Sequence, residues 1–68
     1  MNEETFNMEL RRFLKRVGIT SQRKMEEAVR EALDQGRLKG SETVPARVTL
    51  EIDSLGVREV IEGNIALE

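Results

Sequence analysis

The apolar positions of the chain change their spacing once, near residue 40. Before that point they recur every three or four residues, and after it they alternate with polar positions. The first spacing is typical of amphipathic helices, and the second is typical of strands with one apolar face. The sequence therefore predicts a helical half followed by a strand half.

A first helix is predicted over residues 3–17 from a single apolar stripe. The stripe consists of Phe6, Leu10, Phe13, Leu14 and Val17. Asn2 is a candidate N-cap, because its side chain can accept a hydrogen bond from the first turn. Gly18 stands where a helix-ending glycine belongs, since glycine adopts positive φ without a steric penalty. We therefore expect this helix to end at Val17.

A second helix is predicted over residues 21–35. Its apolar stripe consists of Met25, Ala28, Val29, Ala32 and Leu33. Thr20 and Ser21 are both suitable N-caps, and Gly36 is suited to end the helix. Residues 36–43 then form a loop that leads to the first strand.

Residues 44–67 are predicted to form an antiparallel β-hairpin with one apolar face. The face consists of Val44, Ala46, Val48, Leu50, Ile52, Val57, Ile61, Ile65 and Leu67. Gly63 leaves two alternatives for the second strand: a bulge or bend within one strand, or a separate short strand at Ile65–Leu67. The final Leu67-Glu68 pair is compatible with a native end and with an engineered tail.

One register of this hairpin matches residues on both faces. The apolar pairs are Ile52 with Val57, Val48 with Ile61 and Val44 with Ile65. The charged pairs are Glu51 with Arg58 and Arg47 with Glu62. A shift by a single residue would place charges opposite the apolar row. We therefore interpret the four charged residues as cross-strand pairs on a solvated face.

Glu59 is the one charge that this register places on the apolar face, where it lies opposite Leu50. A carboxylate does not stay charged in a dry core without a partner, because desolvation costs several kcal/mol. Three alternatives follow. Glu59 reaches water at the sheet margin, pairs with Arg37 or Lys39, or faces a second subunit or ligand. The first two are favoured, and Glu59 is kept as a possible interaction residue.

Together these elements predict an α+β fold with the order ααββ, in which two helices cover the apolar face of the hairpin in a second layer. The 68 residues suffice for a single small domain, 1–68. Such a domain is marginally stable alone, and a two-stranded sheet has two free edges. We therefore expect an interaction or scaffold module that forms a homodimer, and we leave open a different protein partner.

The residues that usually carry catalysis or metal binding are missing. The chain contains no cysteine and no histidine, so the common zinc, copper and iron ligand sets are absent and no serine has a histidine base. No calcium loop or glycine-rich phosphate loop is present. We therefore expect no metal, no cofactor and no catalytic residue, and a protein that is not an enzyme.

The most concentrated charge is a basic cluster in the first helix. It consists of Arg11, Arg12, Lys15 and Arg16. Helical spacing places these side chains on the arc opposite the apolar stripe. The simplest interpretation is a solvated face near a helix C-terminus, where the dipole favours cations. The cluster also has the charge to contact phosphates or an acidic partner, so it is kept as a possible interaction site.

Residues Met1–Gln35 also permit a helix-turn-helix, with the hairpin as a wing. This winged-helix reading makes nucleic-acid binding the second function considered. The net charge of −2 and the excess of acidic residues in the second helix count against it. A third helix is also missing. We therefore do not expect nucleic acid as the partner.

No apolar run reaches the length of a membrane span, and the segment Met1-Asn-Glu-Glu is acidic where a secretory signal is basic. These two features predict a cytoplasmic protein without a membrane partner.

Three stretches resemble a family of short bacterial proteins of unknown function. They are Met1-Asn-Glu-Glu-Thr-Phe-Asn-Met8, Phe13–Gln22 and the Gly36–Gly40 turn. The resemblance covers nearly the full chain. It implies a free-standing bacterial protein, and it implies no activity, ligand or site residue.

Overall fold

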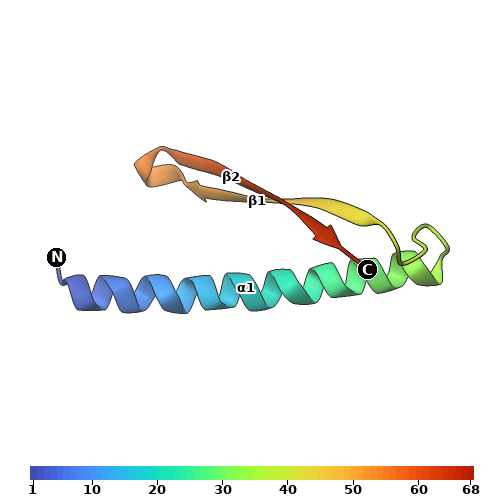
Figure 1. The fold of residues 1–68 in the computed structure, drawn as a ribbon. Helices are drawn as coiled ribbons and strands as arrows, with labels where there is room; N and C mark the ends of the chain where they lie inside the picture. Colours follow the sequence, from blue (N-terminus) through green and yellow to red (C-terminus); the bar gives the residue numbers. More distant parts are fainter. The chain divides into compact units, whose positions relative to one another are not determined.

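The computed structural model describes residues 1–68 and consists of one helix followed by a β-hairpin (Figure 1). The elements are α1 (Glu3–Asp34), β1 (Thr43–Ile52), the short 3-10 helix η1 (Asp53–Leu55) and β2 (Val57–Ala66). The chain divides into two compact units, the helical unit Met1–Arg37 and the hairpin unit Leu38–Glu68. The α+β class expected from the sequence is confirmed.

The prediction of two helices is wrong, because α1 continues without interruption through residues 18–21. Gly18 is helical, and a side chain built at this position would meet no atom within 4 Å. A glycine inside a helix costs only about 1 kcal/mol relative to alanine, which is too little to break a helix favoured on both sides. Thr20 and Ser21, expected as N-caps, also lie inside α1. The helix-turn-helix considered as the alternative for Met1–Gln35 therefore has no turn.

The N-terminus of α1 is capped as the sequence predicts. The side-chain Oδ1 of Asn2 accepts a hydrogen bond from the backbone N–H of Thr5 at 3.1 Å. Glu3 and Glu4 occupy the first turn, where negative charge interacts favourably with the helix dipole. Asn2 is therefore confirmed as the N-cap.

The C-terminus of α1 is closed by a turn at Gly36. This glycine has a φ of 75°, in the left-handed region. The backbone N–H of Gly36 donates to the carbonyl of Leu33 at 3.1 Å. The N–H of Arg37 donates to the carbonyl of Ala32 at 2.8 Å. These two bonds form a Schellman motif, so Gly36 ends the helix as expected.

The two strands pair antiparallel in the register expected from the sequence. The apolar pairs are Ile52–Val57, Val48–Ile61 and Val44–Ile65, and the charged pairs are Glu51–Arg58 and Arg47–Glu62. At the turn, Gly56 has a φ of 65°, and its N–H donates to the carbonyl of Asp53 at 3.2 Å. The residue-by-residue match on both faces confirms that apolar and charged alternation specify this register.

The second strand is continuous across Gly63, which pairs with Ala46. Pairing extends without interruption to Ala66, opposite Thr43. A separate short strand at Ile65–Leu67, one of the two alternatives above, is therefore not formed.

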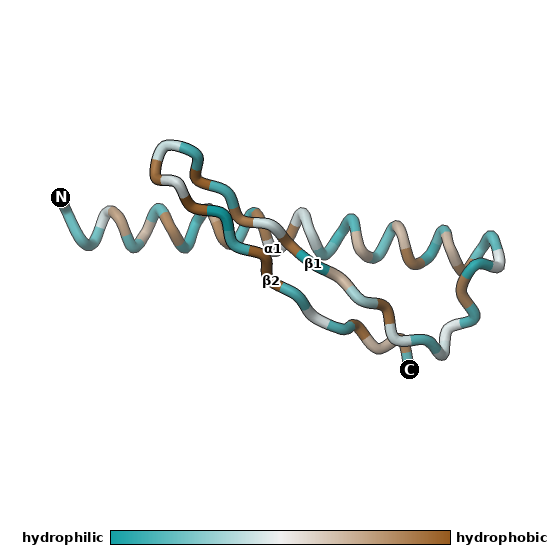
Figure 2. Tube along the Cα trace, turned by 90° about the horizontal axis from the view of Figure 1, so that it is seen from above, coloured by the Kyte–Doolittle hydropathy of each residue, from teal (hydrophilic) through white to brown (hydrophobic).

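Burial within the chain is slight. Ala32 is the only buried residue, with 8% of its surface exposed, and no polar side chain is buried. In α1 the half-buried residues are Val17, Ser21, Met25 and Val29, and in β1 they are Val44, Ala46, Val48 and Leu50. Figure 2 shows hydrophobic positions recurring along the helix and along both strands. A lone helix and a two-stranded sheet have no interior of their own, so much of this apolar surface stays accessible.

Candidate functional site

The N-terminal half of α1 presents a row of exposed apolar side chains, which we call the N-terminal stripe. It consists of Phe6, Leu10, Phe13 and Leu14, with 46%, 41%, 47% and 57% of their surfaces exposed. Their spacing of four, three and one residues puts them on one side of the helix. Single exposed apolar residues are ordinary, but a contiguous group of them marks an interaction surface.

The helix is longer than either strand. Its 32 residues span about 48 Å at about 1.5 Å each, whereas a strand of 10 residues spans about 33 Å. The difference of about 15 Å corresponds to about ten helical residues.

The basic cluster adjoins the N-terminal stripe. Arg12 lies 3.6 Å from the carboxylate of Glu9 and 3.9 Å from the sulfur of Met8. The guanidinium of Arg16 lies over the ring of Phe13, 5.9 Å from its centroid. Such an exposed cation–π contact contributes about 0.5–1 kcal/mol. The side chain of Arg16 therefore extends from the basic cluster onto the N-terminal stripe.

Three members of the cluster, Arg11, Lys15 and Arg16, form no salt bridge. In the C-terminal half of α1 two of the acidic residues lie near bases instead, in the pairs Lys24–Glu27 at 3.6 Å and Arg30–Glu26 at 3.8 Å. Exposed pairs of this kind contribute little to stability. Their effect is to neutralise charge locally, so the unbalanced positive charge of the helix is concentrated between residues 11 and 16.

Glu59 lies opposite Leu50 on the apolar side of the hairpin, as the register predicts. Its side chain is exposed and takes part in none of the salt bridges of the chain, so no pair with Arg37 or Lys39 is formed. The carboxylate therefore lies in water and costs no desolvation. A role for Glu59 in contacts with a partner stays a prediction.

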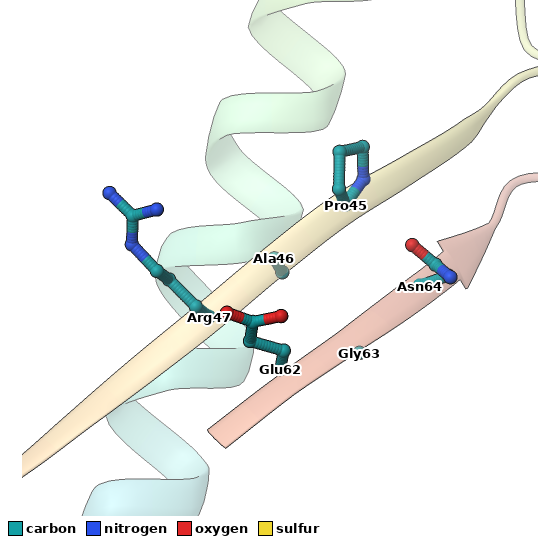
Figure 3. Close-up of a pocket in the computed structure, with 6 residues that line it drawn as sticks. All are labelled: Pro45, Ala46, Arg47, Glu62, Gly63 and Asn64. Atoms are coloured by element: carbon teal, nitrogen blue, oxygen red, sulfur yellow. The ribbon is translucent and has the colours of Figure 1, made fainter. Parts of the chain in front are cut away.

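A shallow hollow lies over the hairpin near the start of β1 and the end of β2 (Figure 3). It is lined by Pro45, Ala46, Arg47, Glu62, Gly63 and Asn64. The hollow lies between the cross-strand pairs Pro45–Asn64 and Arg47–Glu62, over the pair Ala46–Gly63. Arg47 and Glu62 are cross-strand neighbours but form no salt bridge. The hollow is open to solvent and contains no buried polar group, so it does not have the features of a ligand site.

Glu42 organises the loop before β1, a role that the sequence reasoning missed. Its carboxylate accepts hydrogen bonds from the backbone N–H of Lys39 at 2.9 and 3.1 Å and of Gly40 at 2.9 Å. These bonds to the charged form, that of Lys39 first, lower the pKa of Glu42. The signal available in the sequence was an acidic residue directly after a Gly-Ser turn. Glu42 therefore holds the backbone of this loop in place through its carboxylate.

The side chains that bind metal ions in proteins do not converge in this structure. No three of the histidine, cysteine, aspartate and glutamate side chains are close enough to hold one. In the 32 residues of α1, no stretch is apolar enough to cross a bilayer.

The whole chain, residues 1–68, matches the model of a family of unknown function, DUF6494. No curated protein and no solved structure matches the chain. The chain therefore belongs to this family, which confirms the resemblance noted from its sequence.

Proposed function

We propose that this member of the DUF6494 family is a protein-interaction module that self-associates as a homodimer. The observation that carries the proposal is the exposure of apolar side chains in a chain with a single buried residue, Ala32. The exposed set includes the N-terminal stripe on α1 and, on the hairpin, Ile52, Val57, Ile61 and Ile65. A second copy of the same chain is the partner that is always present, because its concentration equals that of the protein itself.

Neither the helical unit nor the hairpin unit has the means to be stable alone. A two-stranded hairpin is at best marginally stable in water, and most helices in proteins are stabilised by packing of their apolar side. No disulfide and no metal cluster reinforces the chain. Fully burying a Phe or Leu side chain contributes about 1.5–3 kcal/mol, so covering the half-exposed N-terminal stripe offers roughly 1 kcal/mol for each residue. Association supplies this contribution.

The module that we propose is not an enzyme. Its charged side chains lie at the surface, and no nucleophile has a histidine or a buried carboxylate beside it. Binding surfaces, rather than reactive groups, are what the chain presents.

Sedimentation equilibrium of the full chain over a dilution series tests the proposal. We expect a mass near twice the 7.8 kDa of one chain at micromolar concentration, falling towards one chain on dilution. The midpoint of thermal unfolding should rise with concentration, because association stabilises the folded state by mass action. A single-chain mass at several hundred micromolar, with a midpoint independent of concentration, would refute the proposal.

A further inference from the structure

We propose that the second copy docks on the N-terminal half of α1, with the two helices antiparallel. This inference rests on the self-association proposed above, and it adds the surface and the orientation. The competing surface for self-association is the free edge of the hairpin.

The apolar residues of this half-helix have the spacing of a two-helix contact. Phe6, Leu10, Phe13 and Val17 follow each other at intervals of four, three and four residues, as the a and d positions of a heptad repeat do. The series reads the same in both directions. An antiparallel copy related by a two-fold axis between residues 11 and 12 therefore places an apolar residue opposite each of the four.

In this arrangement Phe6 lies opposite Val17 of the second copy, and Leu10 lies opposite Phe13 of the second copy. Each contact occurs twice because of the two-fold axis. Large side chains face smaller ones in both pairs, which favours interdigitation. Leu14, the most exposed member of the N-terminal stripe, lies at the edge of this contact and widens its apolar part.

The charges beside the stripe select the antiparallel orientation. Glu9 directly precedes Leu10 and Arg16 directly precedes Val17, so both lie on the same flank, two helical turns apart. In an antiparallel pair, the flank that carries Glu9 and Arg16 faces the same flank of the second copy. Glu9 then meets Arg16 of the second copy, with an offset of about 3 Å along the axis, and the symmetry makes two such pairs.

A parallel pair would lack this complementarity. In a parallel pair, the residue that directly precedes an a position of one helix contacts the residue five positions later in the other helix. Glu9 would then lie beside Leu14 of the second copy, and Arg16 beside Ser21 of the second copy. Neither charge would then have a partner in the second copy.

The single chain leaves the charged groups of this contact accessible. Arg16 forms no salt bridge, and its guanidinium already lies on the stripe, over Phe13. Glu9 contacts Arg12 at 3.6 Å in an exposed pair that gives way to a better-placed partner at little cost. Arg11 and Lys15 project away from the stripe, so the contact brings no cations together.

The hairpin edges offer a weaker alternative. Leu67 donates its N–H to the carbonyl of Glu42 at 3.0 Å, so these two residues form a hydrogen-bonded pair. Hydrogen-bonded and non-hydrogen-bonded pairs alternate along an antiparallel ladder, so Pro45, three residues after Glu42, is in a non-hydrogen-bonded pair and its backbone faces outward at the edge of β1. Proline has no N–H to donate, so this edge is blunted. The edge of β2 carries no proline but includes Arg58 and Glu62. Pairing through β2 is therefore the alternative that the experiment must separate from the helical contact.

A charge swap tests the proposed contact in the full chain. We expect Glu9→Arg and Arg16→Glu each to weaken the dimer roughly tenfold by sedimentation, because each replaces two attractive pairs by two repulsive ones. The double variant Glu9→Arg/Arg16→Glu should restore the affinity to within about threefold. Arg11→Glu is the matched control for Arg16→Glu, with the same charge change on the opposite side of the helix, and it should leave the dimer unchanged. Circular dichroism confirms that each variant stays helical.

Cysteine cross-linking tests the orientation, because the chain has no cysteine of its own. Phe6→Cys and Val17→Cys are oxidised separately and as a mixture. In an antiparallel pair the two copies of position 6 lie about 16 Å apart along the axis, too far for a disulfide, whereas positions 6 and 17 face each other. We therefore expect cross-links in the mixture and none in either variant alone.

The possible results separate the two proposals. A wild-type chain that is monomeric refutes the proposed function itself. A dimer that neither single charge reversal weakens, or that gives no cross-link in the mixture, overturns the helical surface while self-association stands, and it points to the β2 edge. Cross-links in each cysteine variant alone overturn the antiparallel orientation.

Discussion

Two glutamates of the hairpin unit differ in what surrounds their carboxylates. That of Glu42 accepts hydrogen bonds from the backbone of Lys39 and Gly40, whereas that of Glu59 is exposed and in no salt bridge. The first residue was not singled out from the sequence, because a side chain that bonds to a loop backbone has no periodic signal. Glu59 was singled out from the sequence, because one charged residue on an otherwise apolar face breaks the strict alternation of a strand.

The contribution of Glu42 to stability should depend on pH. Hydrogen bonds from the loop backbone lower its pKa in the folded chain, so its stabilising effect is present above the pKa of the unfolded chain, about 4.3. The effect is lost as the pH falls through the lower pKa of the folded chain. We expect Glu42→Gln to be less stable than wild type at pH 7, with the difference vanishing in strong acid.

Urea unfolding at pH 7 and at pH 2 measures this difference, with Glu51→Gln as the control. Glu51 is an exposed strand residue with no salt bridge, so its variant should follow wild type more closely at pH 7. A Glu42→Gln variant as stable as wild type at pH 7 would show that the loop does not need the carboxylate.

Replacing Glu59 by leucine tests whether this carboxylate has a role in the fold. Since it is exposed and in no salt bridge, the stability of Glu59→Leu should hold or rise, by up to about 1 kcal/mol, and the apolar side of the hairpin becomes continuous. Denaturant unfolding at a fixed chain concentration measures the change, with Glu51→Leu on the opposite face as the control. A loss above roughly 2 kcal/mol would reveal a contact of Glu59 that the single chain does not contain.

At the scale of elements, the sequence predicted the hairpin better than the helix. The register follows from matching Ile52 to Val57, because each further pair is then determined by the period of two. The helix end predicted at Gly18 is wrong because a single glycine inside a helix costs too little to end it. Val17 and Met25 lie eight residues apart with the half-buried Ser21 midway between them, so the half-buried side of the helix continues in phase through the glycine. That continuity was the signal for one helix.

The two glycines of the helical unit have opposite requirements, which a matched pair of substitutions should reveal. Gly18 is helical with no atom within 4 Å of an added Cβ, so Gly18→Ala should stabilise the chain by about 0.5–1 kcal/mol. Gly36 has a φ of 75°, which strains any residue with a side chain, so Gly36→Ala should destabilise it by about 1 kcal/mol. Urea unfolding followed by circular dichroism measures both. A destabilising Gly18→Ala would indicate that a partner approaches the helix closely at that glycine.

At the scale of the whole molecule, the sequence identified the basic cluster but not the importance of the apolar residues beside it. Phe6, Leu10 and Phe13 were assigned to a core, because a helical stripe in a small domain usually packs inside it. With one long helix and one hairpin, the fold supplies too little structure to enclose them, and they remain exposed. The N-terminal stripe therefore could not be recognised as a surface until the number of helices was known.

The basic cluster should not make the protein a tight binder of duplex DNA. Its four cations neutralise at most about four phosphates, and the net charge of −2 opposes the approach of a polyanion. The single helix α1 also provides no second helix to position a recognition helix in the major groove. We therefore expect no submicromolar affinity for a duplex at physiological salt, and only weak binding at low salt. Fluorescence anisotropy at two salt concentrations measures this, with Arg11→Glu/Lys15→Glu as the variant that should abolish the weak binding. Submicromolar binding that falls steeply with salt and is lost in this variant would instead establish the cluster as a nucleic-acid contact.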